Sequence, residues 1–383
     1  MRVILAQPYP RDVTLGSPKH FLRLGAALAR QGCTVEYLFL DDLPARWRAQ
    51  RLLYCTFPLA VAQRALSGRY DLVHVASGDA VLAAALRRRG LLRVPVVDHV
   101  LGVEHIHWEH LQAARRRGEE HVSWRHRLWF GVLRRRQVEA AIRWSDRVIC
   151  SCRQDQAAIV AHGWRRADAV TIAPPGVDAL FLEAPPAPLD TPTVLFLGGW
   201  TFRKGIRDLS AAFARVRETM PSARLLVAGA HAPRDAILAS FPEELRPAVT
   251  VGPPSSQPAE LVPLMRACAL LVLPSLYEGF GMAFLEAMAV GLPVVGTPTG
   301  GMADVIVPGV NGLLVPPRDP AALAQALLAL LDDPARRRAL GQAARQTARS
   351  RTWDRAARET LAVYDACLGR QRSRLASAVR AGE

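Results

Sequence analysis

Hydrophobic residues in the first half of the chain fall into short β-branched runs, separated by segments with helical spacing. The runs MRVILA, CTVEYLFL, YDLVHVAS, VPVVDHVL and DRVICSC have strand-like composition, whereas segments such as FLRLGAALARQG repeat apolar residues every three or four positions. This alternation is typical of a doubly wound α/β fold with a parallel sheet. We therefore predict such a sheet here, with a first helix that begins near Phe21.

The second half restarts the same alternation after the proline-rich stretch EAPPAPLDTP. The runs TVLFLGGW, ARLLVAGA, AVTVGPP and LLVLPS indicate strands, and the chain is mostly helical after GLLVPPRD. The prolines between the halves exclude a helix or a central strand there. The sequence thus predicts two Rossmann-like domains, 1–183 and 193–353, a linker over 184–192 and a terminal helix over 354–383. The fold class is α/β, with two doubly wound domains facing across a cleft, where ligands commonly bind.

Length and composition agree with a folded two-domain protein. The 383 residues exceed what one compact core usually needs, and 50% of them are hydrophobic while 22% are charged. This composition excludes disordered, collagen-like and coiled-coil proteins. No apolar run reaches the roughly 18 residues of a membrane span, and the N-terminus lacks the pattern of a signal peptide. The six cysteines are too sparse for a disulfide framework. We expect a cytoplasmic location.

The formal charge of +15 is concentrated in the first half and the tail of the chain. Residues 1–150 contain 24 basic and 13 acidic residues, whereas residues 151–300 are nearly balanced. A basic half suggests an anionic partner, such as a membrane surface, a lipid phosphate or nucleic acid, although solvated arginines are an alternative. Only Lys19 and Lys204 are lysines among the 49 basic residues, so these two stand out as chemically selected.

The segment LLVLPSLYEGFGMAFLEAMAVGLPVVGTPTGG combines a strand, a glycine loop and a helix. Gly279 and Gly281 lie between the strand and a helix predicted over 282–290, and a helix N-terminus of this kind can hold a phosphate. Glu286 is the only charged residue between Gly279 and Ala303. A carboxylate in such apolar surroundings needs partners, and sugar hydroxyls would serve. A solvent-facing Glu286 and an ordinary glycine loop are the alternatives.

Two further loops follow strands and contain candidate ligand contacts. In LGGWTFRKG, Arg203 and Lys204 are adjacent cations suited to a pyrophosphate, and a solvated turn is the alternative. In TLGS, before the first helix, Gly16 would let the backbone approach a ligand, although a plain turn is equally compatible. The sequence contains no G-x-G-x-x-G, Walker A or G-x-S-x-G pattern after these strands.

Together these motifs resemble the retaining family 4 glycosyltransferases, which have the two-domain GT-B fold. The resemblance rests on EGFGMAFLE, GWTFRKG, PPGVD, the Gly-Gly pair at 300–301 and NGLLV. It implies that the first domain binds the acceptor, that the second binds the donor and that the terminal helix crosses back to the first domain. By the same resemblance Glu278 contacts the donor sugar and Glu286 the ribose, while Arg203 and Lys204 neutralise the leaving diphosphate. Backbone amides of Gly279, Phe280 and Gly281 would support the sugar or phosphates, and Gly16 would lie under the donor phosphate.

The chain departs from the family pattern at three positions. Gly199 stands where relatives usually have arginine, and Asp304 stands where they often have glutamate. Many relatives place a catalytic histidine at the position of Leu101; here His99 comes two residues earlier and is a candidate, with a plain core histidine as the alternative.

The expected function is transfer of a sugar from a nucleoside diphosphate sugar to a lipid-linked or saccharide acceptor, with retention. No D-x-D motif is present, so we expect no metal and no other cofactor. An inactive nucleotide-binding homologue and a basic nucleic-acid-binding protein are the alternatives, although the arginines do not lie on a recognisable nucleic-acid module, and we expect no nucleic-acid partner. The Arg- and Trp-rich stretch 111–147 suggests peripheral contact with an anionic membrane or a lipid-pyrophosphate acceptor; a solvated helix with a packed aromatic face is the alternative.

Overall fold

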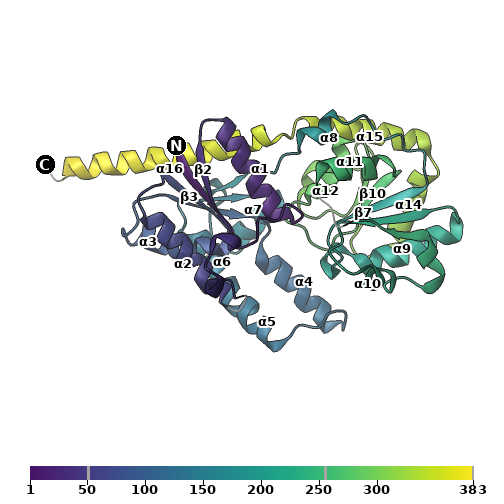
Figure 1. Ribbon diagram of the computed structural model, residues 1–383, viewed down its shortest axis with the longest axis horizontal. Coiled ribbons are helices and arrows are strands. Elements are labelled where there is room, and N and C mark those ends of the chain that lie inside the picture. The colour runs from purple at the N-terminus through teal and green to yellow at the C-terminus, as the bar shows by residue number, and fades with distance from the viewer. Residues whose placement is uncertain (50–51, 254–256, 382–383) are drawn as a thin grey trace. The chain divides into compact units, whose positions relative to one another are not determined.

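The protein consists of two compact α/β units, each built on a six-stranded parallel sheet (Figure 1). The computed structural model describes residues 1–49, 52–253 and 257–381. One unit comprises Met1–Pro174 and the chain from Trp353 onward, and the other comprises Pro175–Thr352. The predicted α/β class with two doubly wound domains is confirmed.

The first sheet has the strand order β2-β1-β3-β4-β5-β6. Its strands are β1 (Arg2–Ala6), β2 (Thr34–Leu38), β3 (Leu72–Ala76), β4 (Val96–Val100), β5 (Arg147–Cys150) and β6 (Val170–Ile172). From β1 the chain adds β2 on one side and β3 on the other, which makes the β1–β3 boundary a topological switch point. Ligands of doubly wound sheets bind at such points, beyond the carboxyl ends of the strands.

Helices of the first unit form two groups and a projecting arm. α1 (Gly16–Arg30) packs with the terminal helix α16 (Trp353–Ala381), and α3 (Val81–Arg88) packs with both α2 (Leu53–Leu66) and α6 (Arg135–Trp144). The arm contains α4 (Glu104–Arg116), α5 (Trp124–Leu128) and the π-helix η4 (Trp129–Arg134). The other helical segments of this unit are α7 (Arg153–Ala161), η1 (Leu40–Asp42), η2 (Ala45–Trp47), η3 (Ser77–Ala80) and η5 (Ala167–Ala169).

The first helix begins earlier than the sequence pattern predicted. α1 starts at Gly16, not near Phe21, so Gly16 belongs to the first helical turn and not to the preceding loop. The apolar periodicity was a poor guide here because the first turn reads GSPK. Pro18 is compatible with a first turn, where backbone N–H groups lack helical partners.

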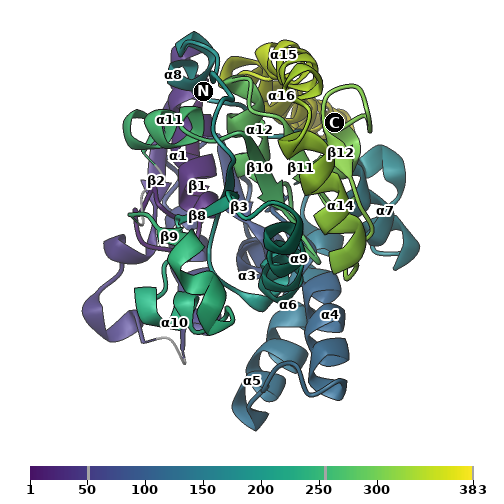
Figure 2. The ribbon, with the colours of Figure 1, turned by 90° about the vertical axis from the view of Figure 1, so that its right-hand side faces the viewer.

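The second sheet has the order β12-β11-β10-β7-β8-β9, with its switch point between β10 and β7. Its strands are β7 (Thr193–Leu197), β8 (Arg224–Ala228), β9 (Val249–Val251), β10 (Leu270–Leu273), β11 (Val294–Gly296) and β12 (Leu313–Leu314). Figure 2 shows α9 (Ile206–Thr219) beside α14 (Pro320–Leu331); α12 (Met282–Ala289) packs with α8 (Ala179–Glu183) and α15 (Pro334–Arg349). The remaining segments are η6 (Phe202–Lys204), α10 (Arg234–Leu238), η7 (Glu243–Ala248), α11 (Pro258–Arg266) and α13 (Gly301–Val305).

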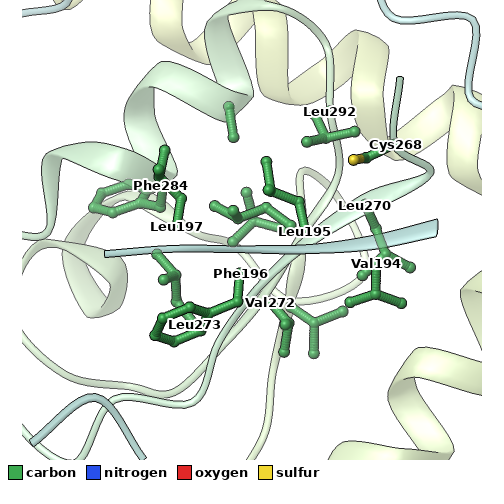
Figure 3. Packing of buried hydrophobic residues seen from close by; sticks show 14 of the residues in the cluster. Val194, Leu195, Phe196, Leu197, Cys268, Leu270, Val272, Leu273, Phe284 and Leu292 are labelled. Carbon is green, nitrogen blue, oxygen red and sulfur yellow. The ribbon is translucent and has the colours of Figure 1, made fainter. Parts of the chain in front are cut away.

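The core of the second unit explains why its central strands read as continuous apolar runs. Strands β7 and β10 are covered on both faces, so Val194–Leu197 and Leu270–Leu273 are buried without alternating with polar residues. Figure 3 shows this cluster, which includes Val194, Leu195, Phe196, Leu197, Val272, Leu273 and Phe284. Truncating such a side chain to alanine typically costs about 2–5 kcal/mol.

The boundary between the units lies before the proline-rich stretch, not within it. The sequence placed the division at 184–192, but the compact units divide at Pro174 and Pro175. The stretch has no helix or strand, yet Ala184 and Leu189 are buried in the second core. Two arginines of α15 also bind its carbonyls: Arg345 Nη2 donates to Ala184 O (2.7 Å) and Arg337 Nη2 to Leu189 O (3.0 Å). These contacts attach 184–192 to the second unit.

The terminal helix belongs to the first unit, where it packs along α1. Arg30 Nη2 binds Asp354 Oδ1 at 2.6 Å, and Gln31 Nε2 donates to Asp354 O at 2.8 Å. Tyr364 from this helix is fully buried. Over the ranges that the structure describes, no helix is both long and apolar enough to cross a membrane.

Candidate functional site

Three loops of the second unit meet at one edge of its sheet. β10 lies between β7 and β11 and pairs with both in parallel, so the carboxyl ends of the three strands share this edge. The loop after β7 contains Arg203 and Lys204, and the loop after β10 contains Glu278. The amide of Leu276 donates to the Arg203 carbonyl (2.8 Å), which fixes the first two loops to each other. The candidate residues therefore lie at the switch point of the sheet.

Arg203, Lys204 and Glu278 form one ionic cluster. Arg203 Nη1 lies 3.0 Å from Glu278 Oε2 and also donates to the Tyr277 carbonyl (3.1 Å). Lys204 Nζ binds Glu278 Oε1, which also accepts a hydrogen bond from Ser275 Oγ at 2.8 Å. Two cations share one carboxylate, so the cluster has a formal surplus of one positive charge.

Burial makes these charges interact strongly. Glu278 is 4% exposed and Lys204 is 9% exposed, whereas the side chain of Arg203 is 34% exposed. Burial alone would raise the pKa of the Glu278 carboxyl, but Lys204 and Arg203 together lower it to about 2. Glu278 is therefore ionised at neutral pH, and the partly exposed guanidinium of Arg203 is the side of the cluster that faces solvent.

Two glycines permit the close approach of the three loops. Gly205 has φ +69°, and a Cβ there would lie 1.9 Å from the Pro274 carbonyl oxygen. Gly300, in the loop after β11, has φ +53°, and a Cβ there would lie 2.7 Å from the Glu278 carbonyl oxygen. Sequence reasoning matched Gly300 to the family pattern but did not assign it this role, and it missed Ser275. Ser275 follows Pro274 at the end of β10, and this position at the start of the loop was the signal that could have identified it.

The predicted donor loop leads directly into α12. Gly281 caps this helix with φ +89°, and Gly279 precedes it. The ring of Phe280 lies in the core, with its centroid 5.3 Å from that of Phe284, so only its backbone is available to a ligand. Glu286 is buried on α12, which excludes the alternative that it points to solvent. The donor-binding roles of these residues remain predictions.

Gly16 and His99 lie in the first unit, apart from the charged cluster in sequence and sheet. Gly16 opens α1 just beyond β1, where Ser17 Oγ donates to Gln7 Oε1 (2.6 Å). His99 lies within β4 and is buried, with Nδ1 2.9 Å from His74 Nε2. The proposed donor-phosphate contact of Gly16 and the proposed catalytic role of His99 remain predictions.

His99 belongs to a group of buried rings beneath the terminal helix. His74 Nδ1 is hydrogen-bonded to the Tyr364 hydroxyl of α16, and the His20 ring contacts both His99 (4.8 Å between centroids) and Trp353 (5.4 Å). Burial lowers the pKa of His20 and of His74 to about 3 and holds the pKa of His99 well below its usual range. These histidines are neutral at physiological pH, and their contacts connect α1, β3 and β4 with α16.

A second buried ionic cluster lies in the first unit and was not anticipated from the sequence. Arg134, at the end of η4, binds Asp79 Oδ2 through Nη2 (2.9 Å) and Glu104 Oε2 through Nε (3.0 Å). Ser77 Oγ also donates to Glu104 Oε1 at 3.3 Å. Burial raises the pKa of Asp79, and Arg134 opposes that rise. Here one cation serves two carboxylates.

Within the described part of the chain, no group of three or more His, Cys, Asp or Glu side chains is placed to hold a metal ion.

Comparison with known proteins finds glycosyltransferase relatives along most of the chain. Residues 16–179 match the family described as Glycosyltransferase Family 4, and residues 191–333 match Glycosyl transferases group 1. A glycogen synthase of Mycobacterium tuberculosis (strain ATCC 25618 / H37Rv) is 34% identical over 376 residues, covering 95% of this chain and 80% of the relative. A D-inositol 3-phosphate glycosyltransferase of Xylanimonas cellulosilytica is 34% identical over 254 residues, or 61% of this chain and 59% of the relative.

Solved structures show the same architecture. The sucrose-phosphate synthase of Thermosynechococcus elongatus superposes with a TM-score of 0.77 at 23% identity, covering 96% of this chain and 99% of that one. Anabaena HepE in complex with UDP-glucose gives a TM-score of 0.71 at 20% identity, covering 95% and 100%. Two doubly wound units of this kind constitute the GT-B fold. The chain belongs to glycosyltransferase family 4, as the sequence motifs predicted.

Proposed function

We propose that the protein transfers a sugar, with retention, from a nucleoside diphosphate sugar to a lipid-linked or saccharide acceptor. The observation that carries this proposal is the Arg203–Lys204–Glu278 cluster, with its surplus positive charge at the switch point of the second sheet. The similarity to a glycogen synthase and to HepE, which was solved with UDP-glucose, supports the choice of donor and acceptor classes.

The proposed mechanism follows from the charges that develop during transfer. Breaking the bond between the sugar and the diphosphate leaves negative charge on the diphosphate and positive charge at the anomeric carbon. Lys204, a compact charge, and Arg203, a planar fork, stabilise the departing diphosphate. The ionised Glu278 carboxylate keeps both cations in place and can accept a hydrogen bond from a sugar hydroxyl. The acceptor hydroxyl attacks from the face that the diphosphate leaves and passes its proton to the departing diphosphate oxygen, without a covalent enzyme intermediate.

The start of α12 completes the proposed donor-binding site. Backbone N–H groups around Gly279 and Gly281 lie at the positive end of this helix and support the sugar or phosphates. The buried Glu286 accepts hydrogen bonds from the ribose hydroxyls, because a carboxylate can accept two at once.

The protein's own cations supply the positive charge, so the proposal includes no metal and no cofactor. We expect the enzyme to act in the cytoplasm. Treatment with EDTA should leave turnover unchanged, and a loss of turnover that Mg²⁺ or Mn²⁺ restores would contradict metal independence.

The proposal is tested by a donor screen on the full-length protein. UDP-glucose, ADP-glucose and GDP-mannose are tested for a rise in Tm and for slow release of nucleoside diphosphate without acceptor. We expect one of these sugar nucleotides to raise Tm and to be slowly cleaved. Glu286→Ala should abolish both the rise in Tm and the cleavage. Glu260→Ala, at an exposed position on α11, should retain both. If no sugar nucleotide binds or is cleaved, the inactive homologue is the better interpretation. A salt-dependent shift of random duplex DNA in its place would favour nucleic-acid binding.

A further inference from the structure

The helical arm of the first unit (residues 104–134) has an outer surface that the proposed donor chemistry does not use. In both ribbon views α4 and α5 extend away from the first sheet (Figures 1 and 2). The two sides of the arm are joined by aromatic contacts, because the Phe130 ring lies 5.8 Å from Trp108 and 5.1 Å from His126. Gly131 permits this packing, since a Cβ there would lie 2.5 Å from the Trp108 ring. The arm is therefore held together from within.

Large apolar side chains remain on the outside of the arm. All five residues of α5 are exposed, including Trp124 at 63%, and Trp129 (37%) and Val132 continue this surface along η4. Trp124 and Leu128 are four residues apart on α5 and therefore share one side of that helix. Contiguous exposed apolar surface of this kind marks an interaction site more often than isolated exposed residues do.

The same surface is rich in exposed arginine. Arg125 and Arg127 lie on α5, and the Arg125 guanidinium is 5.5 Å from the centre of the Trp124 ring. At the tip, an open hollow of about 630 Å³ is lined by Arg115, Trp124 and Arg127 together with Glu119 and Glu120. The nearby Glu119 is engaged by Arg117 at 3.0 Å. The tip thus combines cationic side chains with an exposed tryptophan.

We propose that this arm binds the surface of an anionic phospholipid bilayer, with Trp124, Leu128 and Trp129 at the interface and the arginines on the headgroup phosphates. An apolar protein partner would cover the tryptophans but leave the surrounding guanidinium groups without counter-ions. An anionic bilayer satisfies both, because tryptophan favours the interface and each basic residue near the surface is attracted by the lipid charge. The reason for binding a bilayer rests on the proposed function, since a bilayer would present a lipid-linked acceptor. The binding of the arm to a bilayer does not depend on that function.

The test is co-sedimentation of the full-length protein with vesicles of phosphatidylcholine, with or without phosphatidylglycerol. We expect binding only to the anionic vesicles and release at high salt. The double variant Trp124→Ser/Trp129→Ser should weaken the partition coefficient at least roughly tenfold. Trp144→Ser is the control, because Trp144 lies outside the arm on α6 and its exposure of 36% is close to the 37% of Trp129. Arg125→Gln/Arg127→Gln should weaken binding roughly fivefold for each arginine removed, and Arg153→Gln/Arg166→Gln should not.

Each outcome decides between distinct possibilities. Equal binding by wild type and the tryptophan double variant, or no binding to anionic vesicles, would overturn the proposal. A dimer in sedimentation velocity that Trp129→Ser dissociates would instead assign the surface to a second copy of the chain. Unchanged circular dichroism and Tm in the variants exclude unfolding as the cause. Vesicle binding without any cleavage of sugar nucleotides would overturn the proposed function and leave the arm's assignment standing.

Discussion

The two units contain buried ionic clusters of opposite composition. In the second unit Arg203 and Lys204 share the carboxylate of Glu278, whereas in the first unit Asp79 and Glu104 share the guanidinium of Arg134. Both clusters lie beyond the carboxyl ends of parallel strands, and both contain nearly inaccessible charges. Burial and position therefore do not distinguish them.

The sign of the surplus charge does distinguish them. The second cluster has one cation more than it needs, and the Arg203 side chain is partly exposed, so it can receive an anionic leaving group. In the first cluster the guanidinium is buried and bound by two carboxylates, which leaves it no net positive charge to offer. We therefore expect the first cluster to support the fold and the second to support catalysis. Variants of each cluster test this division.

Replacing Arg134 should destabilise the protein more than replacing either cation of the second cluster. Arg134→Met removes the guanidinium that binds both Asp79 and Glu104, and breaking a buried ion pair in this way costs about 3–5 kcal/mol. Urea unfolding followed by tryptophan fluorescence measures the loss, because seven of the eight tryptophans belong to the first unit. Arg143→Met, which breaks the exposed pair with Glu139, should change stability by about 0.5 kcal/mol or less. Equal effects of the two variants would contradict a structural role for the Arg134 cluster.

Replacing Lys204 should show the opposite balance, with a large loss of activity and a small loss of stability. In Lys204→Ala the Glu278 carboxylate keeps Arg203 and Ser275 as partners, so it is not left uncompensated. Loss of one preorganised group that stabilises transition-state charge typically lowers kcat about 10²–10³-fold. The rate of nucleoside diphosphate release measures this effect. Arg207→Ala, which removes an exposed cation three residues away, should retain kcat. Near-native kcat in Lys204→Ala would place the diphosphate elsewhere.

Acidification should lower the stability of the two units in different pH ranges. The folded protein keeps His20 neutral with a pKa of about 3, against 6.5 as the ordinary value, so stability is lost as the pH falls below 6.5. The pKa of Glu278 is about 2 in the fold against 4.5 ordinarily, so its contribution is present above pH 4.5 and is lost only below it. As the pH falls from 6.5 to 4.5, the free energy of unfolding of His20→Leu should therefore rise by about 2 kcal/mol relative to that of wild type.

Urea unfolding at the two pH values measures this difference. Other titrating groups, including the buried Asp98 whose pKa burial raises well above its ordinary value, contribute to wild type and variant alike and largely cancel. Glu278→Gln is the control, because its stability relative to wild type should not change over this range. A parallel pH response of His20→Leu and wild type would mean that the folded protein protonates His20.

The sequence predicts those parts of the site that are formed by residues close together in the chain. It does not predict those that depend on which strands lie side by side in the sheet. The strands, and the motifs that follow them, could be predicted because apolar runs and glycine loops are local. The pairing of Glu278 with Lys204 could not, because 74 residues separate them and only the adjacency of β7 and β10 brings them together. The Asp79–Arg134 pair spans 55 residues without a motif at either end. The domain boundary was misplaced because prolines mark the absence of regular structure, not the absence of packing.

The smallest expected effect concerns Gly199, where relatives usually have arginine. The nearest atom to a Cβ at this position would be Thr201 Cγ2, at 3.9 Å, so a side chain can begin here without moving the backbone. If Arg203 and Lys204 bind the diphosphate, Gly199→Arg adds a third cation to the same loop and should lower KM for the donor roughly fivefold to tenfold, the effect of about 1 kcal/mol of added binding. Gly199→Gln, which adds a polar side chain without the charge, should leave KM nearly unchanged. An unchanged KM in both variants would mean that this loop does not contact the donor phosphates, and that the surplus charge of the second cluster has another purpose.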